Sequence, residues 1–556
     1  MPRRILSRRD LLRLAGAGTL VLGAGSLLGA CAATSQPRID TPAVPTIDGL
    51  AQPTRNPAFN PDLDVTLRAT QSEVQLLPGT STKVWVYQAQ VNAGDAATVQ
   101  ALPNSYLGPI IRVRTGQKLR VTFENALPDA TQTSIIHWHG LHIPPVIDGH
   151  PSGVIAPGER YIYEFTVNDR AGTYWFHPHP HGMIGKQVTM GLAGLFLVSD
   201  AEEDAAGLPT GTYDLPVVIQ DRTFDSQNQF VYQPDMMAQM MGFLGERLLV
   251  NGAPDLTLDL ATRVYRLRVL NGSNSRIYKL AWNTGAPLTV IGTDGGLLEA
   301  PVTRAFVMLA PGERIELWAD LRDVPLGTTL TLVSQVFTGA EGVGTEGGMG
   351  SMDGMGGMDH GAMGGMSNDN APPLGAALDI LRIRVIRQED ETLILPSTLA
   401  RIERYQLEDA VNRDNPRPIA LSLRGMEWRI NGKTFEMNAV APDEVIKLDT
   451  IEVWEISNEI NPGEMMDPMG MAHPIHIHGR QFQVISRDVL PDLRNGWEGI
   501  KEGYVDEGWK DTVLVMPGER VKLLMAFRDY LGTYVYHCHN LEHEGAGMMR
   551  NYRVDA

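Results

Sequence analysis

A four-residue turn, Pro-Gly-Glu-Arg, occurs three times in this chain and constrains its fold more than any other feature. The copies begin at Pro157, Pro311 and Pro517, and each precedes a strand-like run that a Gly-Thr turn separates from a second run. Proline presets φ and glycine adopts φ values that other residues avoid, so Pro-Gly between apolar runs is typical of a hairpin turn. Because many short strands with regular turns indicate β-sandwiches, the three copies predict an all-β chain of three β-sandwich domains.

The predicted domains cover residues 50–200, 212–388 and 398–556. A length of 556 residues is sufficient for several domains with buried cores. One segment, 341–370, breaks the strand pattern because it consists mostly of Gly, Met, Asp and Ser. Glycine at this density loses too much backbone entropy in a strand or a helix, so we expect a loop inserted in the second domain.

Residues 1–31 have the pattern of an export signal rather than of a folded domain. Five arginines and one aspartate are combined with an apolar stretch of Ala, Gly and Leu, which is typical of a secretory signal. The order Ser7-Arg8-Arg9 resembles the twin-arginine signal, and Leu-Gly-Ala before Cys31 resembles a lipoprotein box. Ordinary cleavage after the Ala-x-Ala end at 30–32 is the alternative to a lipid anchor on Cys31. We therefore expect export to the periplasm or the cell surface, as a lipoprotein or as a free protein.

Charge and cysteine content exclude several functions. The formal net charge of −18 argues against a nucleic-acid partner, because binding to phosphates needs patches of Lys and Arg. After the first thirty residues no apolar run approaches the roughly 20 residues that span a bilayer. Only Cys31 and Cys538 are present, so removal of the leader leaves a lone thiol that needs a specific reason in an exported protein. We expect a monomer.

Thirteen of the 14 histidines fall into four clusters, and only His360 lies outside them. The clusters occupy residues 137–150, 177–181, 473–478 and 537–543, and each contains a His-x-His pair. Alternate side chains of a strand share a face, so each pair aims two imidazoles in one direction, roughly 6.5–7 Å apart along the backbone. Pairs from different strands could together hold a cluster of metal ions.

In His537-Cys538-His539 the thiol points to the face opposite its two neighbours, so one strand could serve two metal sites. His473, Cys538 and His543, with Met548 as a weak axial thioether, make the ligand set of a blue copper site. Zinc prefers Cys/His tetrahedra from a small local loop, and one Cys with ten histidines fits it poorly. Because the middle repeat carries no histidine, we expect the metals on the first and third domains, facing each other, with the second domain as a spacer.

The four clusters, in this order and spacing, resemble the multicopper oxidases over essentially the whole chain after the leader. The motifs that begin at His137 (His-Trp-His-Gly-Leu), Trp175 (Trp-Phe-His-Pro-His-x-His-Gly) and His537 (His-Cys-His-x-Leu-Glu-His-Glu-x-x-Gly-Met-Met) are similar to those of bacterial laccase-like cuprous oxidases. The resemblance implies three cupredoxin-like Greek-key domains and four copper ions. It also implies one-electron oxidation of a reductant at a type 1 copper, coupled to the reduction of O2 to water at a trinuclear cluster.

The resemblance assigns the ligands by matched position. It places the type 1 copper on His473, Cys538, His543 and Met548, the type 2 copper on His137 and His476, and the type 3 pair on His139, His177, His179, His478, His537 and His539. Cys538 would transfer electrons to its neighbours along the strand. Asp148 and Glu544 match acidic positions to which the resemblance gives a proton relay, although Asp148-Gly149 could also be a simple turn. We expect His142, His150 and His181 to lie on the surface or beside the ligands.

The methionines bear on the choice of reductant because soft thioethers suit Cu(I). Six lie in the inserted segment, at Met349, Met352, Met355, Met358, Met363 and Met366, with no other apolar residues beside them to explain core packing. Met465, Met466, Met469 and Met471 crowd just before His473. Met471 matches a methionine that cuprous-oxidase relatives use to dock substrate copper, whereas Asp467 is shifted from their aspartate. Four further methionines between 236 and 241, next to Asp235, have helical spacing and could form core or a lid.

Three functions are compatible with these patterns. The first is a copper-tolerance oxidase that converts Cu(I) to Cu(II), and the second is a laccase that acts on phenols or manganese. The third is a non-catalytic protein of the cell envelope that sequesters copper or has a structural role. Degenerate members of the third kind lose ligands, and this chain retains all twelve, which favours an enzyme.

Overall fold

The computed structural model describes residues 53–556 except 341–369, 426 and 459–469. The described residues belong to one compact unit, Pro45–Ala556. The predictions for residues 1–31, for His360, for Asp467 and for the six methionines of the inserted segment lie outside the described residues. No helix within the described ranges has the length and apolar character needed to cross a bilayer.

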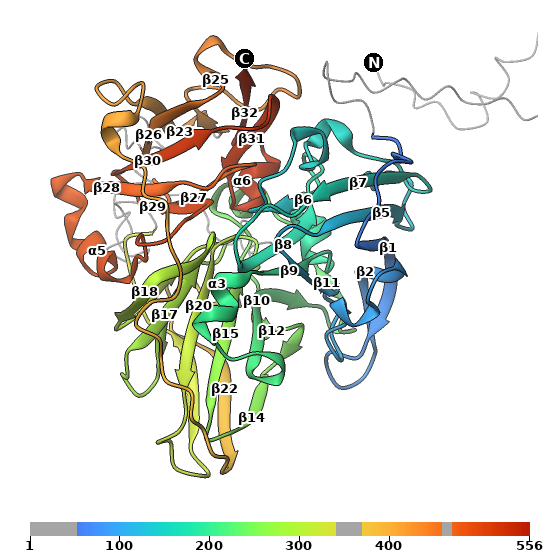
Figure 1. Ribbon diagram of the computed structural model, residues 1–556, viewed down its shortest axis with the longest axis vertical. Coiled ribbons are helices and arrows are strands. Elements are labelled where there is room, and N and C mark those ends of the chain that lie inside the picture. The colour runs from blue at the N-terminus through green and yellow to red at the C-terminus, as the bar shows by residue number, and fades with distance from the viewer. Residues whose placement is uncertain (1–52, 341–369, 426, 459–469) are drawn as a thin grey trace, which may run out of the picture. The chain divides into compact units, whose positions relative to one another are not determined.

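Within the described ranges, six sheets form three pairs along the chain (Figure 1). The first pair has the strand orders β2-β1-β5-β7 and β3-β4-β9-β8-β6. Its strands are β1 (Leu63–Val74), β2 (Thr82–Ala93), β3 (Val99–Gln100), β4 (Ile110–Arg114), β5 (Lys118–Ala126), β6 (Ile136–His139), β7 (Arg160–Thr166), β8 (Gly172–Pro178) and β9 (Gly194–Ser199). Buried side chains of both sheets, from Leu63 to Val198, make one core.

The second pair has the orders β13-β12-β10-β15-β20-β17-β18, with β11 beside β10, and β14-β22-β21-β16-β19. Its strands are β10 (Asp214–Phe224), β11 (Phe230–Val231), β12 (Arg247–Val250), β13 (Ala253–Pro254), β14 (Thr257–Ala261), β15 (Val264–Asn271), β16 (Tyr278–Trp282), β17 (Leu288–Thr293), β18 (Gly296–Arg304), β19 (Val307–Leu309), β20 (Arg314–Asp320), β21 (Thr329–Ser334) and β22 (Leu378–Arg387). A second core fills the space between these sheets.

The third pair has the orders β24-β23-β26-β30-β28 and β25-β32-β31-β27-β29. Its strands are β23 (Arg417–Arg424), β24 (Glu427–Ile430), β25 (Val445–Lys447), β26 (Thr450–Asn458), β27 (His473–Ile477), β28 (Gln483–Val489), β29 (Thr512–Val515), β30 (Glu519–Phe527), β31 (Gly532–Cys538) and β32 (Met549–Asp555). The three pairs confirm the all-β class. Each pair falls within one of the predicted domain ranges, whose end points stay a prediction.

The helices among the described residues are short and lie in the connections. They are α2 (Ile184–Thr189), α3 (Ala201–Ala206), α4 (Met236–Met241), α5 (Arg494–Glu498) and α6 (Leu541–Gly545). Two of them, α4 and α6, contact each other although three hundred residues separate them in the sequence.

The Pro-Gly-Glu-Arg turns are not hairpins, and this corrects the prediction. Each turn leads into a strand of the sheet opposite to the one just left: β6 and β7, β19 and β20, and β29 and β30 belong to different sheets. The Gly-Thr turn that follows then returns the chain, because β7 and β8, β20 and β21, and β30 and β31 are also in opposite sheets. A tight turn has the same chemistry whether the flanking strands pair with each other or with distant strands, so the local sequence does not distinguish the two.

The four strands on which the His-x-His pairs begin are buried along nearly their whole length. Of these, β6 contains both members of its pair, whereas in the other three the second histidine lies just beyond the end of the strand. β6, β8 and β27 are buried at every residue, and β31 at all but its first. A strand at the surface of a single sandwich alternates instead, as β7 does. One face of the four strands packs in its own sandwich, and the other face meets a neighbouring domain.

Candidate metal centre

A thiol and two imidazoles meet within the third domain; we call His473, Cys538 and His543 the sulfur site. His473 begins β27, Cys538 ends β31, and His543 lies on α6. The Cys538 sulfur lies 3.4 Å from Nδ1 of His473 and 3.7 Å from Nδ1 of His543, and the two nitrogens are 3.3 Å apart. All three side chains are fully buried.

The sulfur site has the chemistry of a metal site. Nε2 of His543 donates to the Met240 carbonyl at 2.7 Å, which leaves a lone pair on the Nδ1 that faces the sulfur. Burial lowers the pKa of His543 to about 3, and it raises the pKa of the Cys538 thiol. Neutral imidazoles are the form that binds metals, and a coordinated thiol loses its proton outright. Lone pairs that converge in this way repel one another unless a cation lies between them.

Met548 is held beside both of these ligands by the backbone. Its N–H donates to the His543 carbonyl at 2.9 Å, and its carbonyl accepts from the N–H of Cys538 at 3.0 Å. The Met548 side chain is fully buried. This placement is compatible with the axial thioether that the resemblance implies, and the role stays a prediction.

Eight further histidines, which we call the histidine cluster, meet where the first and third domains face each other. Strand register aligns His137 with His177 across β6 and β8, and His476 with His537 across β27 and β31. The members are His137, His139, His177, His179, His476, His478, His537 and His539, each at most 1% exposed. Contacts between the two domains include His137 Nε2 to His476 Nε2 at 3.2 Å and His179 Nε2 to His537 Nε2 at 3.3 Å.

Backbone and carboxylate oxygens determine which ring nitrogen carries the proton. Nδ1 of His137 donates to the Asp148 carbonyl at 2.6 Å, and Nδ1 of His478 donates to the Asp148 carboxylate at 2.7 Å. These oxygens only accept, so each Nε2 retains a lone pair. His139 is reversed: its Nε2 donates to Asp511 at 3.0 Å, and its Nδ1 faces Nε2 of His177 at 3.4 Å.

The histidine cluster can hold several ions close together. Three sets of ligand atoms lie within 4.8 Å of one another: His137, His139 and His177; His137, His476 and His478; and His179, His478 and His537. His539 lies with its ring 5.0 Å from that of His139, and neither of its nitrogens has a hydrogen-bond partner among the described residues. Burial lowers the pKa of His137, His139 and His177, that of His177 to about 3, so these three are neutral ligands.

Both acidic residues predicted for proton transfer contact the histidine cluster. Glu544 Oε1 lies 3.1 Å from His179 Nε2, and its Oε2 lies 3.2 Å from His537 Nδ1. Asp148 is buried, burial raises its pKa, and its Oδ1 lies 3.7 Å from His137 Nδ1 without a hydrogen bond to any described residue. The alternative of a turn also holds, because Gly149 has φ +92 and a Cβ there would lie 2.4 Å from the Ile136 carbonyl.

Other predicted residues lie apart from the metal groups. His142 contacts Asp529 and Arg480, His150 bonds Ser152 and Asn551, and His181 is exposed. Met471 is only 2% exposed and packs in the core of the third domain, so its thioether is not open to solvent.

On helix α4 the core alternative applies to Met240, and the lid alternative stays a prediction. Asp235 caps the helix by accepting from the N–H of Ala238 at 2.7 Å. Met240 is buried in the core of the third domain, whereas Met236 is 68% and Met237 53% exposed.

The second domain is more than the spacer that we expected. It supplies the Met240 carbonyl to the sulfur site, and its Arg314 pairs with Asp511, which contacts His139. Neither Asp511 nor Arg314 was predicted from the sequence to be a functional residue. The available signal was the arginine that ends each Pro-Gly-Glu-Arg turn, since nothing in the turn itself requires that residue.

Comparison with known proteins agrees with this geometry. Sequence models described as multicopper oxidase match residues 83–203 and 402–556. "Multicopper oxidase mco" of Staphylococcus haemolyticus is 32% identical, covering 81% of this chain and 82% of its own. "Laccase" of Bacillus stratosphericus is 30% identical over 84% of this chain and 90% of its own. The crystal structure of the McoA multicopper oxidase from Aquifex aeolicus matches with a TM-score of 0.71 and 33% identity, over 90% of this chain and 97% of that one.

The cupredoxin-like sandwiches expected from the resemblance are therefore shared with solved relatives. The similarity over most of each chain, the three paired sheets and the two buried groups of potential ligand atoms all agree with one family whose members use copper, O2 and a reductant. This chain belongs to the multicopper oxidases.

Proposed function

We propose that this protein is a cuprous oxidase that protects its host from copper. The reaction takes one electron from each of four Cu(I) ions and combines the four electrons with O2 and four protons to give two waters. Four resident copper ions supply the redox chemistry: one on the sulfur site with Met548 and three on the histidine cluster. In the family pattern, His137 and His476 hold the type 2 ion and the remaining six histidines the type 3 pair.

One hydrogen bond carries the proposal for the substrate. The N–H of Ala472, directly before the sulfur-site ligand His473, donates to the carbonyl of Ala340 at 2.8 Å. Ala340 is the residue after which the methionine-rich segment 341–370 begins. The chain therefore enters this thioether-rich segment next to the site where electrons enter, and thioethers suit Cu(I).

A second observation supports a soft cation as substrate. The Met240 carbonyl accepts from His543 Nε2 at 2.7 Å and from Trp428 Nε1 at 2.9 Å, so α4 is fixed against the sulfur site. The exposed Met236 and Met237 lie on this same short helix, one turn from Met240. The proposal thus places further thioethers on the electron-entry side.

The end of β31, which carries Cys538, supports an electron route between the two sites. Cys538 belongs to the sulfur site, and its covalent neighbours His537 and His539 belong to the histidine cluster. Electrons can therefore pass from the sulfur site to the histidine cluster along covalent bonds, without a jump between separate segments of the chain. We propose that Asp148 and Glu544, which touch the cluster, hold and deliver the protons for O2 reduction.

Oxygen uptake by the copper-loaded protein tests the substrate. We would measure rates with chelated Cu(I) and with a dimethoxyphenol, for the full chain and for a variant in which the six methionines of segment 341–370 are replaced by leucine. The leucine variant keeps the length and apolar character of the segment and removes only sulfur. We expect Cu(I) to be the better substrate and the variant to slow Cu(I) oxidation selectively.

Two outcomes would replace the proposal. A faster phenol reaction, with both rates indifferent to the leucine variant, would identify a laccase, which the similarity to the Bacillus stratosphericus enzyme makes the second candidate. Binding of Cu(I) without any oxygen uptake would identify a copper-sequestering protein.

A further inference from the structure

The arginine that ends each Pro-Gly-Glu-Arg turn lies in a different environment in the second domain than in the other two. Arg160 and Arg520, the copies in the first and third domains, are exposed. Arg314 is fully buried at the start of β20. Since the turn is the same in all three copies, local structure does not account for burying this one guanidinium.

Arg314 joins all three domains through its guanidinium group. It donates to Asp511 in the third domain through two nitrogens, at 2.8 and 2.5 Å. It also donates to the Thr173 carbonyl in the first domain and to the Asp294 carbonyl in its own, both at 2.9 Å. Arginine is suited to this role because its planar fork matches a carboxylate with two parallel bonds.

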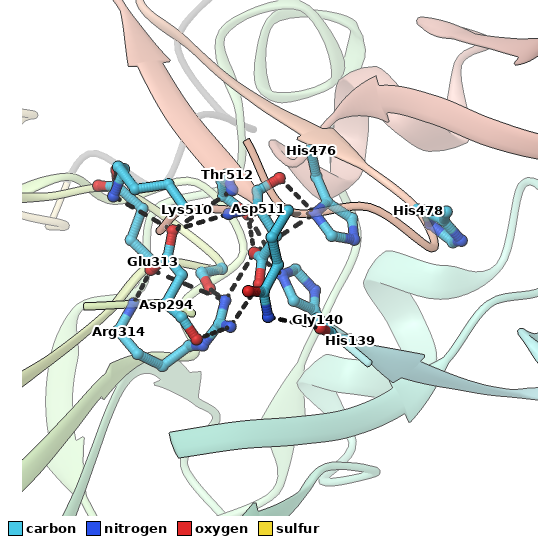
Figure 2. A network of polar contacts seen from close by, with 12 residues as sticks. His139, Gly140, Asp294, Glu313, Arg314, His476, His478, Lys510, Asp511 and Thr512 are labelled. Atoms are coloured by element: carbon cyan, nitrogen blue, oxygen red, sulfur yellow. Dashed lines mark hydrogen bonds and ion pairs between the residues drawn. The ribbon is translucent and has the colours of Figure 1, made fainter. Parts of the chain in front are cut away.

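A second layer of charges holds this pair in place (Figure 2). Asp294 accepts from the backbone N–H of Arg314 at 2.7 Å and from Lys510 Nζ at 3.1 Å. Lys510 Nζ also pairs with Glu313 at 3.0 Å. Every group in this layer is at most 6% exposed, so the arrangement is built into the domain interface.

Asp511 contacts two histidines of the cluster in two different ways. Its side-chain Oδ1 accepts from Nε2 of His139 at 3.0 Å. Its backbone carbonyl accepts from Nδ1 of His476 at 2.8 Å. The same residue therefore leaves Nδ1 free on a histidine of the first domain and Nε2 free on a histidine of the third.

We infer that Asp511, held by Arg314, is a positioning residue that selects opposite ring nitrogens of His139 and His476 as metal ligands. The partner of a ligating histidine decides its tautomer and its ring orientation. Loss of the Asp511 carboxylate leaves only the neutral hydroxyl of Thr512, 3.2 Å from His139 Nε2, as an acceptor. Because a charged acceptor holds a proton more strongly than a neutral one, the His139 ring can then place its proton on Nδ1, and a protonated Nδ1 cannot bind a metal. This inference depends on the copper-binding part of the proposed function and not on the identity of the reductant.

The test compares Asp511→Ala, Asp511→Asn and Arg314→Gln in the copper-loaded full chain. Asp511→Ala removes the carboxylate acceptor for His139, leaves the Thr512 hydroxyl 3.2 Å from the same nitrogen, and keeps the backbone carbonyl for His476. Asp511→Asn can still accept at Oδ1. Arg160→Gln and Arg520→Gln are matched controls at the same position of the exposed turns. We would measure copper ions per chain, the electron paramagnetic resonance spectrum and the blue absorption of the sulfur site. We would also measure the rate at which this absorption bleaches without O2 and the rate at which it returns when O2 is added.

We expect Asp511→Ala to lose copper from the cluster and to show a new resonance signal from an uncoupled Cu(II). Without O2, the reductant should bleach the blue absorption at the same rate as in the parent chain. After O2 is added, the blue absorption should return about 10–100-fold more slowly. Arg314→Gln should change in the same direction, Asp511→Asn should be intermediate, and both control variants should match the parent chain.

Two results would overturn the inference. One is an Asp511→Ala variant with unchanged copper content, resonance spectrum and return rate. The other is equal loss at the sulfur site and the cluster in all three variants, because that shows a general structural role. Neither result depends on whether Cu(I) or a phenol is the better substrate, so failure of the proposed substrate leaves this test intact.

Discussion

The sulfur site and the histidine cluster are built on opposite principles. All ligand atoms of the sulfur site come from one domain, within residues 473–543, and the second domain adds only the Met240 carbonyl that accepts from His543. The histidine cluster divides its ligands between the first and third domains, and the second domain supports it through Arg314, which pairs with Asp511 of the third. Ligands on one domain are brought together mainly by that domain's core, whereas ligands on two domains need correct docking as well. The two sites should therefore respond differently to the same kind of change.

Cys538→Ser should give the largest difference in response between the sulfur site and the histidine cluster. A hydroxyl does not replace the soft thiolate, so the blue absorption and oxidase activity should fall below detection. The histidine cluster should keep its copper because Cys538 points to the opposite face of β31 from His537 and His539. Copper per chain, measured beside oxygen uptake, checks this. Loss of all copper would mean that the two sites are not separable.

Removal of the cluster's acids should slow O2 reduction without affecting the sulfur site. Glu544→Gln keeps the shape of a side chain that lies 3.1 Å from His179 and 3.2 Å from His537, and removes its proton-carrying group. A positioned acid or base typically contributes about 10²–10⁴-fold, and we expect a loss in that range. Anaerobic bleaching of the blue absorption should be unchanged. Asp148→Asn provides the second variant, and normal turnover in both would contradict the relay.

Acid should destabilise the copper-free protein. Burial lowers the pKa of His177 and His543 to about 3, below the ordinary value near 6.5 in an unfolded chain. Between these values the unfolded chain binds more protons, so the free energy of unfolding falls as pH falls, by about 1.4 kcal/mol per pH unit for each such histidine. Copper should raise the free energy of unfolding without reducing this slope, because these imidazoles are unprotonated in the folded chain with or without the metal. Denaturant unfolding at several pH values, with and without copper, checks it.

The smallest expected effect is a difference between alanine substitutions at two glycines in equivalent positions of the repeated turn. Gly312 and Gly158 occupy the same position of the repeated turn, with φ +85 and +92. A Cβ on Gly312 would lie 3.0 Å from the His539 ring, whereas a Cβ on Gly158 meets nothing within 4 Å. Both alanine variants should lose about 1–2 kcal/mol of stability from backbone strain. Only Gly312→Ala should alter the cluster's resonance spectrum, and equal spectra would show that the second domain's turn does not restrain the cluster.

Much of the metal chemistry could be predicted from the sequence because it depends on short spacings. His-x-His in a strand requires two imidazoles on one face, and the structure brings both predicted groups together at Cys538 and at His137. The residues that choose the tautomers could not be found in this way. Asp511 precedes β29 without any motif, and its partner Arg314 lies 197 residues away.

The sequence by itself determined the all-β class, the threefold repeat and the His-x-His spacing that places imidazoles on one face of a strand. These follow from periodicity and turn chemistry, which act over a few residues. Only the tertiary structure decided that the repeated turns cross between sheets, that Met471 is buried, and that Arg314 is buried while Arg160 and Arg520 are exposed. These outcomes depend on which surfaces pack together across domains. Contacts between distant segments produce no periodic pattern in the sequence.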